Sequence, residues 1–282
     1  MVERKIIFLD IDGTLCLEDG SILESSVYAC TKARARGHRI FLCTGRSKPE
    51  IFDNILEIGF DGIIGTGGAY IEVDEEVLFQ KMLTFEQSKH AVDYFGKKGI
   101  PFFLECDSGL YASKDFLPTL EKIIYLNTSK EELDQIKQRG EYHPFLQLMK
   151  SGENLYRDDV NKISFFDNNN VDFEEIKKEF EKDFQVIHGS VELFGPNSGE
   201  VGVLGINKAS AIVYLLKHIG EDAKDCYAIG DGRNDIEMFE HCARSIAMGN
   251  AHPDLKMRAE HIVSSNNENG VYEAFDYLGL LD

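Results

Sequence analysis

Basic residues are scarce in this sequence of 282 residues, where 30 Lys and Arg accompany 49 Asp and Glu and leave a formal net charge of -19. Such a charge repels DNA, RNA and anionic membrane surfaces at long range, so we expect no nucleic-acid partner. It also disfavours a phosphorylated ligand. Any phosphate site must therefore carry its own positive charge, most simply a divalent metal ion and a lysine.

Cysteine is also infrequent, and long apolar segments are absent. The six cysteines form no CxxC pair and have no regular spacing, which argues against a zinc site or a disulfide framework. No uninterrupted apolar run approaches the roughly 20 residues that a helix needs to cross a bilayer, which excludes a membrane pump. The N-terminal residues lack the apolar segment of a signal peptide. We therefore expect a cytoplasmic protein with reduced thiols and no membrane partner.

Short apolar runs alternate with helical stretches near both ends of the sequence. Residues 6–9 form such a run, which ends at Asp10, and residues 25–36 predict a helix before a second strand at 39–43. This order is typical of a doubly wound α/β fold with a mostly parallel sheet. The same pattern predicts further strands and helices, at residues 62–64, 226–229, 245–248 and 261–263 for strands, and at residues 49–58, 208–218 and 234–241 for helices.

The middle of the sequence has a different order of elements. Between residues 81 and 188, helices that begin with capping boxes alternate with strand-like runs such as residues 101–104 and 163–166. We interpret residues 81–188 as an inserted α+β domain. The α/β core domain is then formed by residues 1–80 and 189–282.

Polar residues follow three of the predicted core strands. In an open parallel sheet, ligands bind beyond the carboxyl ends of the strands, near the point where the strand order reverses. Asp10, Thr44 and Asp231 all occupy such ends. Four distant segments thus predict one site: Asp10-Ile11-Asp12-Gly13-Thr14-Leu15, Thr44-Gly45-Arg46, Lys208, and Gly230-Asp231-Gly232-Arg233-Asn234-Asp235.

Each segment alone also fits a simpler interpretation. Asp10 and Asp12 before Gly13 are compatible with a turn that ends a strand, since Asp-Gly is common in turns. A calcium-binding EF-hand loop does not fit, because Ser21 occupies the position of its bidentate glutamate. Lys208 is compatible with a solvated residue beside a helix N-cap. Only the order of the four segments favours a shared site.

With these four motifs in this order, the chain resembles the haloacid dehalogenase (HAD) superfamily of phosphotransferases, in particular its Cof-type branch (subfamily IIB) with a large α/β cap. The resemblance extends over essentially the whole chain. It implies a HAD-like Rossmannoid core, an inserted α+β cap domain and a phosphoric monoester hydrolase that acts on a small metabolite, such as a sugar phosphate or a phosphorylated cofactor. Two positions depart from the family pattern, Gly67 in place of an Asn and Ala209 in place of a Gly.

The resemblance also implies roles for individual residues. Asp10 is the nucleophile that forms an aspartyl-phosphate, and Asp12 is the general acid and base. The phosphoryl oxygens are bound by four further groups, namely Thr44, the Gly45 amide, Lys208 and Asn234.

Mg²⁺ is the expected cofactor, because a carboxylate that attacks a phosphate dianion meets charge repulsion that a divalent cation cancels. Mg²⁺ prefers oxygen ligands. We assign the side chains of Asp10 and Asp231 and the backbone carbonyl of Asp12 as ligands. Asp235, one helical turn beyond Asp231, is expected to orient a metal-bound water or Lys208.

Two other functions stay open at this point. A sugar phosphomutase of the same superfamily uses the same pair of aspartates but returns the phosphoryl group to its sugar. A catalytically silent module that binds metal or phosphate is the second, although this chain retains both the nucleophile and the lysine. The sequence leaves the substrate and the oligomeric state undetermined.

Overall fold

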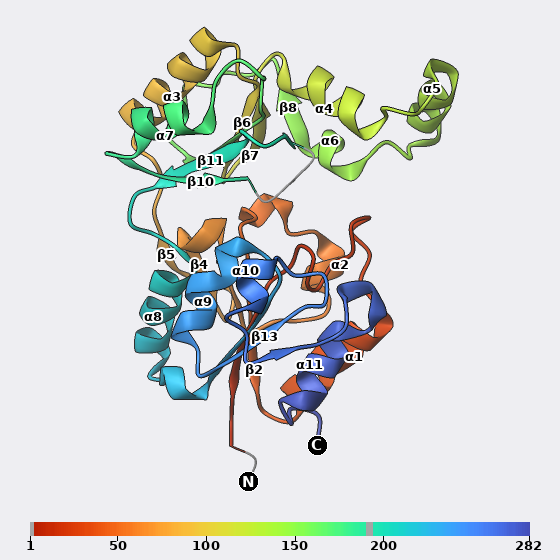
Figure 1. The fold of residues 1–282 in the computed structure, drawn as a ribbon, viewed down its shortest axis with the longest axis vertical. Coiled ribbons are helices and arrows are strands. Elements are labelled where there is room, and N and C mark those ends of the chain that lie inside the picture. Colours follow the sequence, from red (N-terminus) through yellow and green to blue (C-terminus); the bar gives the residue numbers. More distant parts are fainter. Residues whose placement is uncertain (1–2, 190–193) are drawn as a thin grey trace. The chain divides into compact units, whose positions relative to one another are not determined.

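The computed structural model describes residues 3–189 and 194–282, which form two compact units (Figure 1). The first unit comprises Met1–Gln80 and Ile206–Asp282, and the second comprises Lys81–Gly205. Residues 190–193 of the predicted core segment lie outside the described residues. None of the helices in the described ranges is long and apolar enough to cross a bilayer.

The first unit is built on an eight-stranded sheet with the order β14-β13-β12-β1-β2-β3-β4-β5. Its six strands from β14 to β3 are parallel, and β4 and β5 extend it as an antiparallel hairpin. The strands are β1 (Ile6–Leu9), β2 (Arg39–Cys43), β3 (Gly62–Gly65), β4 (Tyr70–Val73), β5 (Glu76–Gln80), β12 (Cys226–Gly230), β13 (Arg244–Ala247) and β14 (His261–Ile262).

Helices cover both faces of this sheet, because its central strands are apolar throughout and must be buried on both sides. Figure 1 shows α1 (Glu24–Ala35) and α11 (Gly270–Tyr277) on one face and α8 (Lys208–Ile219) and α9 (Ile236–His241) on the other. The short helices α2 (Asp53–Leu56) and α10 (Pro253–Lys256) complete the unit. The predicted doubly wound α/β fold with its mostly parallel sheet is confirmed.

The strand order reverses next to β1. The chain continues from β1 to β2 on one side and returns much later as β12 on the other, so β1 pairs in parallel with both strands. Asp10 extends the ladder, since its backbone N–H donates to the carbonyl of Ile229 at 3.0 Å. The carboxyl ends of β1 and β12, followed by Asp10 and Asp231, therefore lie side by side at the switch point.

The helix predicted at residues 49–58 is wrong in its extent. The structure has a 3₁₀ turn at Lys48–Glu50 and a separate short helix, α2, because Ile51 and Phe52 are extended. Glu50 ends the first turn by accepting hydrogen bonds from the Ser47 backbone and hydroxyl at 2.8 and 2.6 Å. A buried local capping network thus replaces the continuous helix.

The second unit contains a six-stranded sheet with the order β10-β11-β9-β6-β7-β8, antiparallel except for the pair β7 and β8. Its strands are β6 (Phe102–Cys106), β7 (Gly109–Ala112), β8 (Met149–Ser151), β9 (Val160–Phe165), β10 (Phe184–His188) and β11 (Gly199–Val203). Its helices are α3 (Phe85–Lys98), α4 (Phe116–Ile124), α5 (Lys130–Arg139), α6 (Pro144–Leu148) and α7 (Phe173–Phe180).

Aromatic side chains fill two cores in this second unit. Phe95 of α3 contacts Phe165 of β9 and Phe180 of α7, with ring centroids 5.0 and 5.4 Å apart. Phe103 of β6 contacts Phe116 of α4 with centroids 4.8 Å apart. Phe95 also contacts Phe102, the neighbour of Phe103 in β6, with centroids 5.5 Å apart. Because adjacent residues of a strand point to opposite faces, the sheet is packed on both faces.

The inserted domain extends beyond its predicted end at residue 188. The prediction places residues 199–203 in the core segment 189–282, but they form β11, which pairs with β9 and β10 and therefore belongs to the sheet of the second unit. Its sequence, Gly199-Glu200-Val201-Gly202-Val203, contains two glycines and carries a weak strand signal. The chain returns to the first unit at Ile206.

Candidate active site

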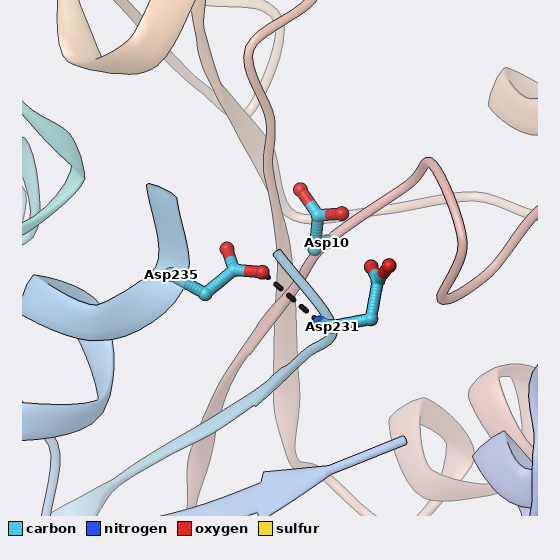
Figure 2. Close-up of side chains that lie close together, drawn as sticks. All are labelled: Asp10, Asp231 and Asp235. Atoms are coloured by element: carbon cyan, nitrogen blue, oxygen red, sulfur yellow. Dashed lines mark hydrogen bonds between the residues drawn. The ribbon is translucent and has the colours of Figure 1, made fainter. Parts of the chain in front are cut away.

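Asp10 is buried at the end of β1, with 5% of its surface exposed. Its side chain lies within a group of three carboxylates, completed by Asp231 and Asp235, whose oxygens lie within 4.8 Å of one another. Figure 2 shows these three side chains converging at the end of the sheet, with Asp10 from one strand and Asp231 and Asp235 from the loop and turn after another. Three carboxylates at this spacing repel one another strongly.

Lys208 supplies positive charge within this group. It is the first residue of α8, and its exposed fraction is only 2%. Its ammonium donates to Asp10 Oδ1 and to Asp235 Oδ1, both at 2.6 Å. Asn207 fixes the start of the helix, because its side chain accepts a hydrogen bond from the Ser210 backbone. The helix cap therefore determines where the ammonium enters the site.

Asp235 is fully buried, and its side chain holds the loop after β12 through hydrogen bonds. Its Oδ1 accepts from Lys208, while its Oδ2 accepts the backbone N–H groups of Asp231 at 3.1 Å and Gly232 at 2.9 Å. The first of these backbone bonds is the dashed line in Figure 2. Asp235 thereby fixes both the lysine and the backbone that carries Asp231.

Asp231 is held from the other side by the segment after β1. Thr14 donates its hydroxyl hydrogen to Asp231 Oδ1 at 2.9 Å. Gly13 has a φ of +75°, and a Cβ at this position would lie 2.2 Å from Asp231 Oδ2. Only glycine therefore fits beside this carboxylate.

Burial and neighbouring carboxylates raise the pKa values of the carboxyl groups at this site. Burial raises the pKa of Asp10 well above its ordinary value, against the opposing effect of Lys208, and Asp235 and Asp231 raise it further. Burial, with Asp235 nearby, raises the pKa of Asp231 to about 7. Burial disfavours the charged form of Lys208, but Asp10 and Asp235 keep its pKa well above the usual range. One ammonium thus faces three carboxylates.

This arrangement fits a divalent cation. All the candidate ligands are oxygen atoms, which Mg²⁺ prefers, and Asp231 is only half-buried, so the group is accessible to an ion and its waters. The charge balance points the same way, since the ammonium of Lys208 is accompanied by the three carboxyl groups of Asp10, Asp231 and Asp235. Asp10 and Asp231 are suited to bind the ion directly, and Asp235 is already engaged by Lys208 and two backbone amides.

Asp12 follows β1 two residues after Asp10, but its carboxylate contacts Arg46 and not the group of Asp10, Asp231 and Asp235. Both of its oxygens accept hydrogen bonds from Arg46, with Nε–Oδ2 and Nη2–Oδ1 distances of 3.0 and 2.7 Å. The Asp12 side chain is 63% exposed. The predicted metal contact through the Asp12 backbone carbonyl does not involve these side-chain oxygens.

The other predicted phosphate ligands lie in loops next to this group. Thr44 is buried after β2, and its hydroxyl oxygen accepts the Arg46 backbone N–H at 3.1 Å. Gly45 lies between these two residues. Asn234 is half-buried in the 3₁₀ turn Arg233–Asp235. The structure therefore brings together the side chains of Asp10, Lys208, Asp231 and Asp235, and it places Thr44, Gly45 and Asn234 in the adjoining loops.

Three supporting residues received no role in the sequence analysis, namely Thr14, Arg46 and Asn250. Asn250 donates to the carbonyl of Gly13 at 2.7 Å, and its Oδ1 accepts the backbone N–H of Asn266 at 3.0 Å. Thr14 and Arg46 are part of the motifs that predicted the site, so their positions in those motifs were the available signal. Asn250 follows β13, another strand whose carboxyl end lies at the same edge of the sheet.

Comparison with known proteins gives a consistent result. A model of the haloacid dehalogenase-like hydrolases matches residues 7–275. YkrA of Bacillus subtilis is 28% identical, over 99% of this chain and 100% of its own. The 5-amino-6-(5-phospho-D-ribitylamino)uracil phosphatase YwtE of the same organism is 28% identical, over 97% of this chain and 98% of its own.

The fold has similar solved structures. That of a sugar phosphatase of HAD subclass IIB is 26% identical to this chain, with a TM-score of 0.74 over 98% of this chain and 100% of that one. The similarity thus includes both units, not the α/β unit alone.

Proposed function

The chain belongs to the haloacid dehalogenase-like hydrolase family, and from this premise we propose that it is a Mg²⁺-dependent phosphatase that acts through an aspartyl-phosphate on Asp10. Its proposed substrate is a small phosphorylated metabolite. The phosphatase names of relatives that match over nearly the whole chain support this class of reaction. The similar sugar phosphatase of subclass IIB supports a small substrate.

The observation that carries the proposal is the buried Lys208 ammonium, which contacts Asp10 and Asp235 at 2.6 Å although they are 198 and 27 residues away in sequence. Burying charged groups costs several kcal/mol per ion, so stability alone gives little reason to collect them. Their convergence at the switch point of a parallel sheet is the arrangement expected of a reactive site.

Asp10 has the geometry of a nucleophile. Lys208 binds its Oδ1, and no donor among the described residues reaches its Oδ2. The lysine therefore fixes the carboxylate while one oxygen is available to attack phosphorus. Asp10, Asp231 and the Asp12 carbonyl would hold Mg²⁺, which would supply positive charge that offsets the repulsion between this carboxylate and a phosphate dianion.

The proposed reaction has two displacements. In the first, an Asp10 oxygen bonds to phosphorus, the bond from phosphorus to the leaving oxygen breaks, and Asp12 gives that oxygen a proton. In the second, Asp12 takes a proton from a water molecule that attacks the phosphorus, and the bond between phosphorus and Asp10 breaks. The proposed phosphate ligands Thr44, Gly45, Lys208 and Asn234 would stabilise the charge on the transferring group.

An Asp10→Asn substitution tests this proposal. We expect release of phosphate from 4-nitrophenyl phosphate with Mg²⁺ present to fall by at least about a thousandfold, because a neutral amide cannot form the acyl phosphate. Asp19→Asn is the matched control, since Asp19 is an exposed carboxylate in the following loop and, among the described residues, its side chain forms hydrogen bonds only with Ser21. Wild-type rates in Asp10→Asn would refute the mechanism.

A screen of phosphorylated metabolites addresses the substrate. Sugar phosphates and phosphorylated cofactors are incubated with the protein and Mg²⁺, and both free phosphate and isomeric sugar phosphates are measured. Free phosphate is the expected product. An isomeric sugar phosphate in its place would indicate a phosphomutase.

A further inference from the structure

Arg46 makes a two-point contact with the carboxylate of Asp12. Its Nε and Nη2 donate to the two different oxygens of Asp12, at 3.0 and 2.7 Å. This fork geometry fixes the plane of a carboxylate as well as its position. A single-point contact from a lysine would restrain the position but not the plane.

Arg46 and Asp12 differ in their exposure and in the number of contacts that restrain them. The Arg46 side chain is 16% exposed and the Asp12 side chain is 63% exposed. Arg46 Nη1 donates to the backbone carbonyl of Glu50 at 2.9 Å, and its guanidinium lies 5.5 Å from the centre of the Phe52 ring. Arg46 is thus anchored by the segment after β2, whereas Asp12 depends on Arg46 for its orientation.

The backbone of Arg46 is tied to the neighbouring strand ends. Its N–H donates to the Thr44 hydroxyl at 3.1 Å, and its carbonyl accepts the Thr66 N–H at 2.8 Å. Thr66 has a φ of +52°, which is rare for a β-branched residue and marks a loop that is held by its surroundings. The guanidinium therefore projects from a backbone with little freedom to move.

We propose that Arg46 is a positioning residue for Asp12, which fixes the carboxylate that exchanges a proton with the leaving group. The inference rests on the proposed function. A carboxylate has about four lone-pair sites, so one oxygen of Asp12 can keep a contact with Arg46 while the other carries or accepts the transferred proton. Without Arg46, the exposed Asp12 side chain would sample several rotamers, and few of them would direct an oxygen at the leaving group.

The leaving group of the substrate provides a selective readout. Phenyl phosphate and 4-nitrophenyl phosphate have similar shapes, but phenolate is the more basic leaving group and needs a proton more. The value of kcat/KM includes only steps up to formation of the phosphoenzyme, the step in which Asp12 acts as an acid. Misplacing the acid should therefore lower kcat/KM more for phenyl phosphate.

For Arg46→Met we expect kcat/KM to fall about tenfold more with phenyl phosphate than with 4-nitrophenyl phosphate. Arg46→Lys, which keeps the charge but not the fork, should recover only part of this difference. Lys48→Met is the matched control, because Lys48 lies two residues away and pairs with Glu72 instead. It should change neither value by more than about twofold.

A double substitution completes the test. In an Asp12→Asn background, Arg46→Met should cause no further selective loss, because the residue through which it acts is gone. Equal losses on both substrates for Arg46→Met and Arg46→Lys, or an undiminished selective loss beside Asp12→Asn, would overturn the inference. The proposed function fails separately, if wild-type hydrolysis of both substrates does not depend on Asp10.

Discussion

At the scale of single residues, Lys208 is the side chain on which the candidate site depends most. Its ammonium is buried between Asp10 and Asp235, so removing it leaves two carboxylates without their partner in a place that excludes water. Breaking a buried ion pair from one side usually costs more than the pair contributes, because the remaining charge has no solvent.

Lys208→Met should therefore lower the free energy of unfolding by about 3 kcal/mol as well as abolish phosphatase activity. Urea denaturation at neutral pH, without added metal, measures the change. Lys217→Met is the control, since Lys217 lies on the same helix but is exposed, and we expect it to change stability by less than about 0.5 kcal/mol. A Lys208→Met variant as stable as the wild type would contradict the role of the ion pair.

At the scale of elements, the segment between β1 and α1 contains two glycines with similar backbone conformation and different surroundings. Gly13 has a φ of +75° and Gly20 a φ of +80°. A Cβ on Gly13 would overlap Asp231, whereas a Cβ on Gly20 would have no heavy atom within 4 Å. Alanine substitutions at these two glycines therefore distinguish the effect of backbone strain, which both share, from the effect of displacing Asp231, which only the Gly13 substitution has.

Gly20→Ala should lose about 1 kcal/mol of stability, because alanine is disfavoured in the left-handed region. Gly13→Ala should lose more, because its Cβ also overlaps Asp231. Only Gly13→Ala should also raise the Mg²⁺ concentration for half-maximal activity, by about tenfold, since it displaces a proposed ligand. Titrating activity with Mg²⁺ in both variants measures the difference. Equal Mg²⁺ dependence would place Asp231 outside the metal site.

The element boundaries show what local sequence misses. The helix predicted at residues 49–58 has an apolar pattern, but Glu50 turns back to cap Ser47 and the chain becomes extended at Ile51. Strand β11 has two glycines and a weak pattern, and its place in the second sheet is decided by pairing with β9 and β10. Both outcomes depend on partners that a local window does not contain.

At the scale of the whole molecule, the net charge of -19 makes added salt and added Mg²⁺ both stabilising, for different reasons. Any salt screens the mutual repulsion of surface carboxylates. A specific Mg²⁺ site adds a further term, because the folded state binds the ion and the unfolded state does not.

We expect Mg²⁺ at millimolar concentration to raise the thermal midpoint by about 3 °C more than NaCl at equal ionic strength. EDTA should reverse the difference. Asp231→Asn should remove the extra increment and keep the response to NaCl, because it changes one proposed ligand among many acidic residues. Equal responses to both salts in the wild type would argue against a specific site.

The sequence by itself determined the family and the α/β core, and it supplied the residues proposed to react. Apolar runs that end in Asp10, Thr44 and Asp231 identify buried parallel strands, and the family that the order of four motifs predicts, the HAD-like hydrolases, is confirmed. These features are readable because strand burial and strand-end chemistry are both encoded in neighbouring residues.

Only the tertiary structure decided which of these residues touch. In the fold, Lys208 donates hydrogen bonds to Asp10 and Asp235. Thr14 donates to Asp231, and Arg46 donates to the Asp12 side chain. Tertiary pairing also decides that residues 199–203 belong to the second sheet. Such contacts join distant segments of the chain, as Asn250 and Gly13 do across 237 residues. They are fixed by the packing of strands and helices, which no local pattern of residues specifies.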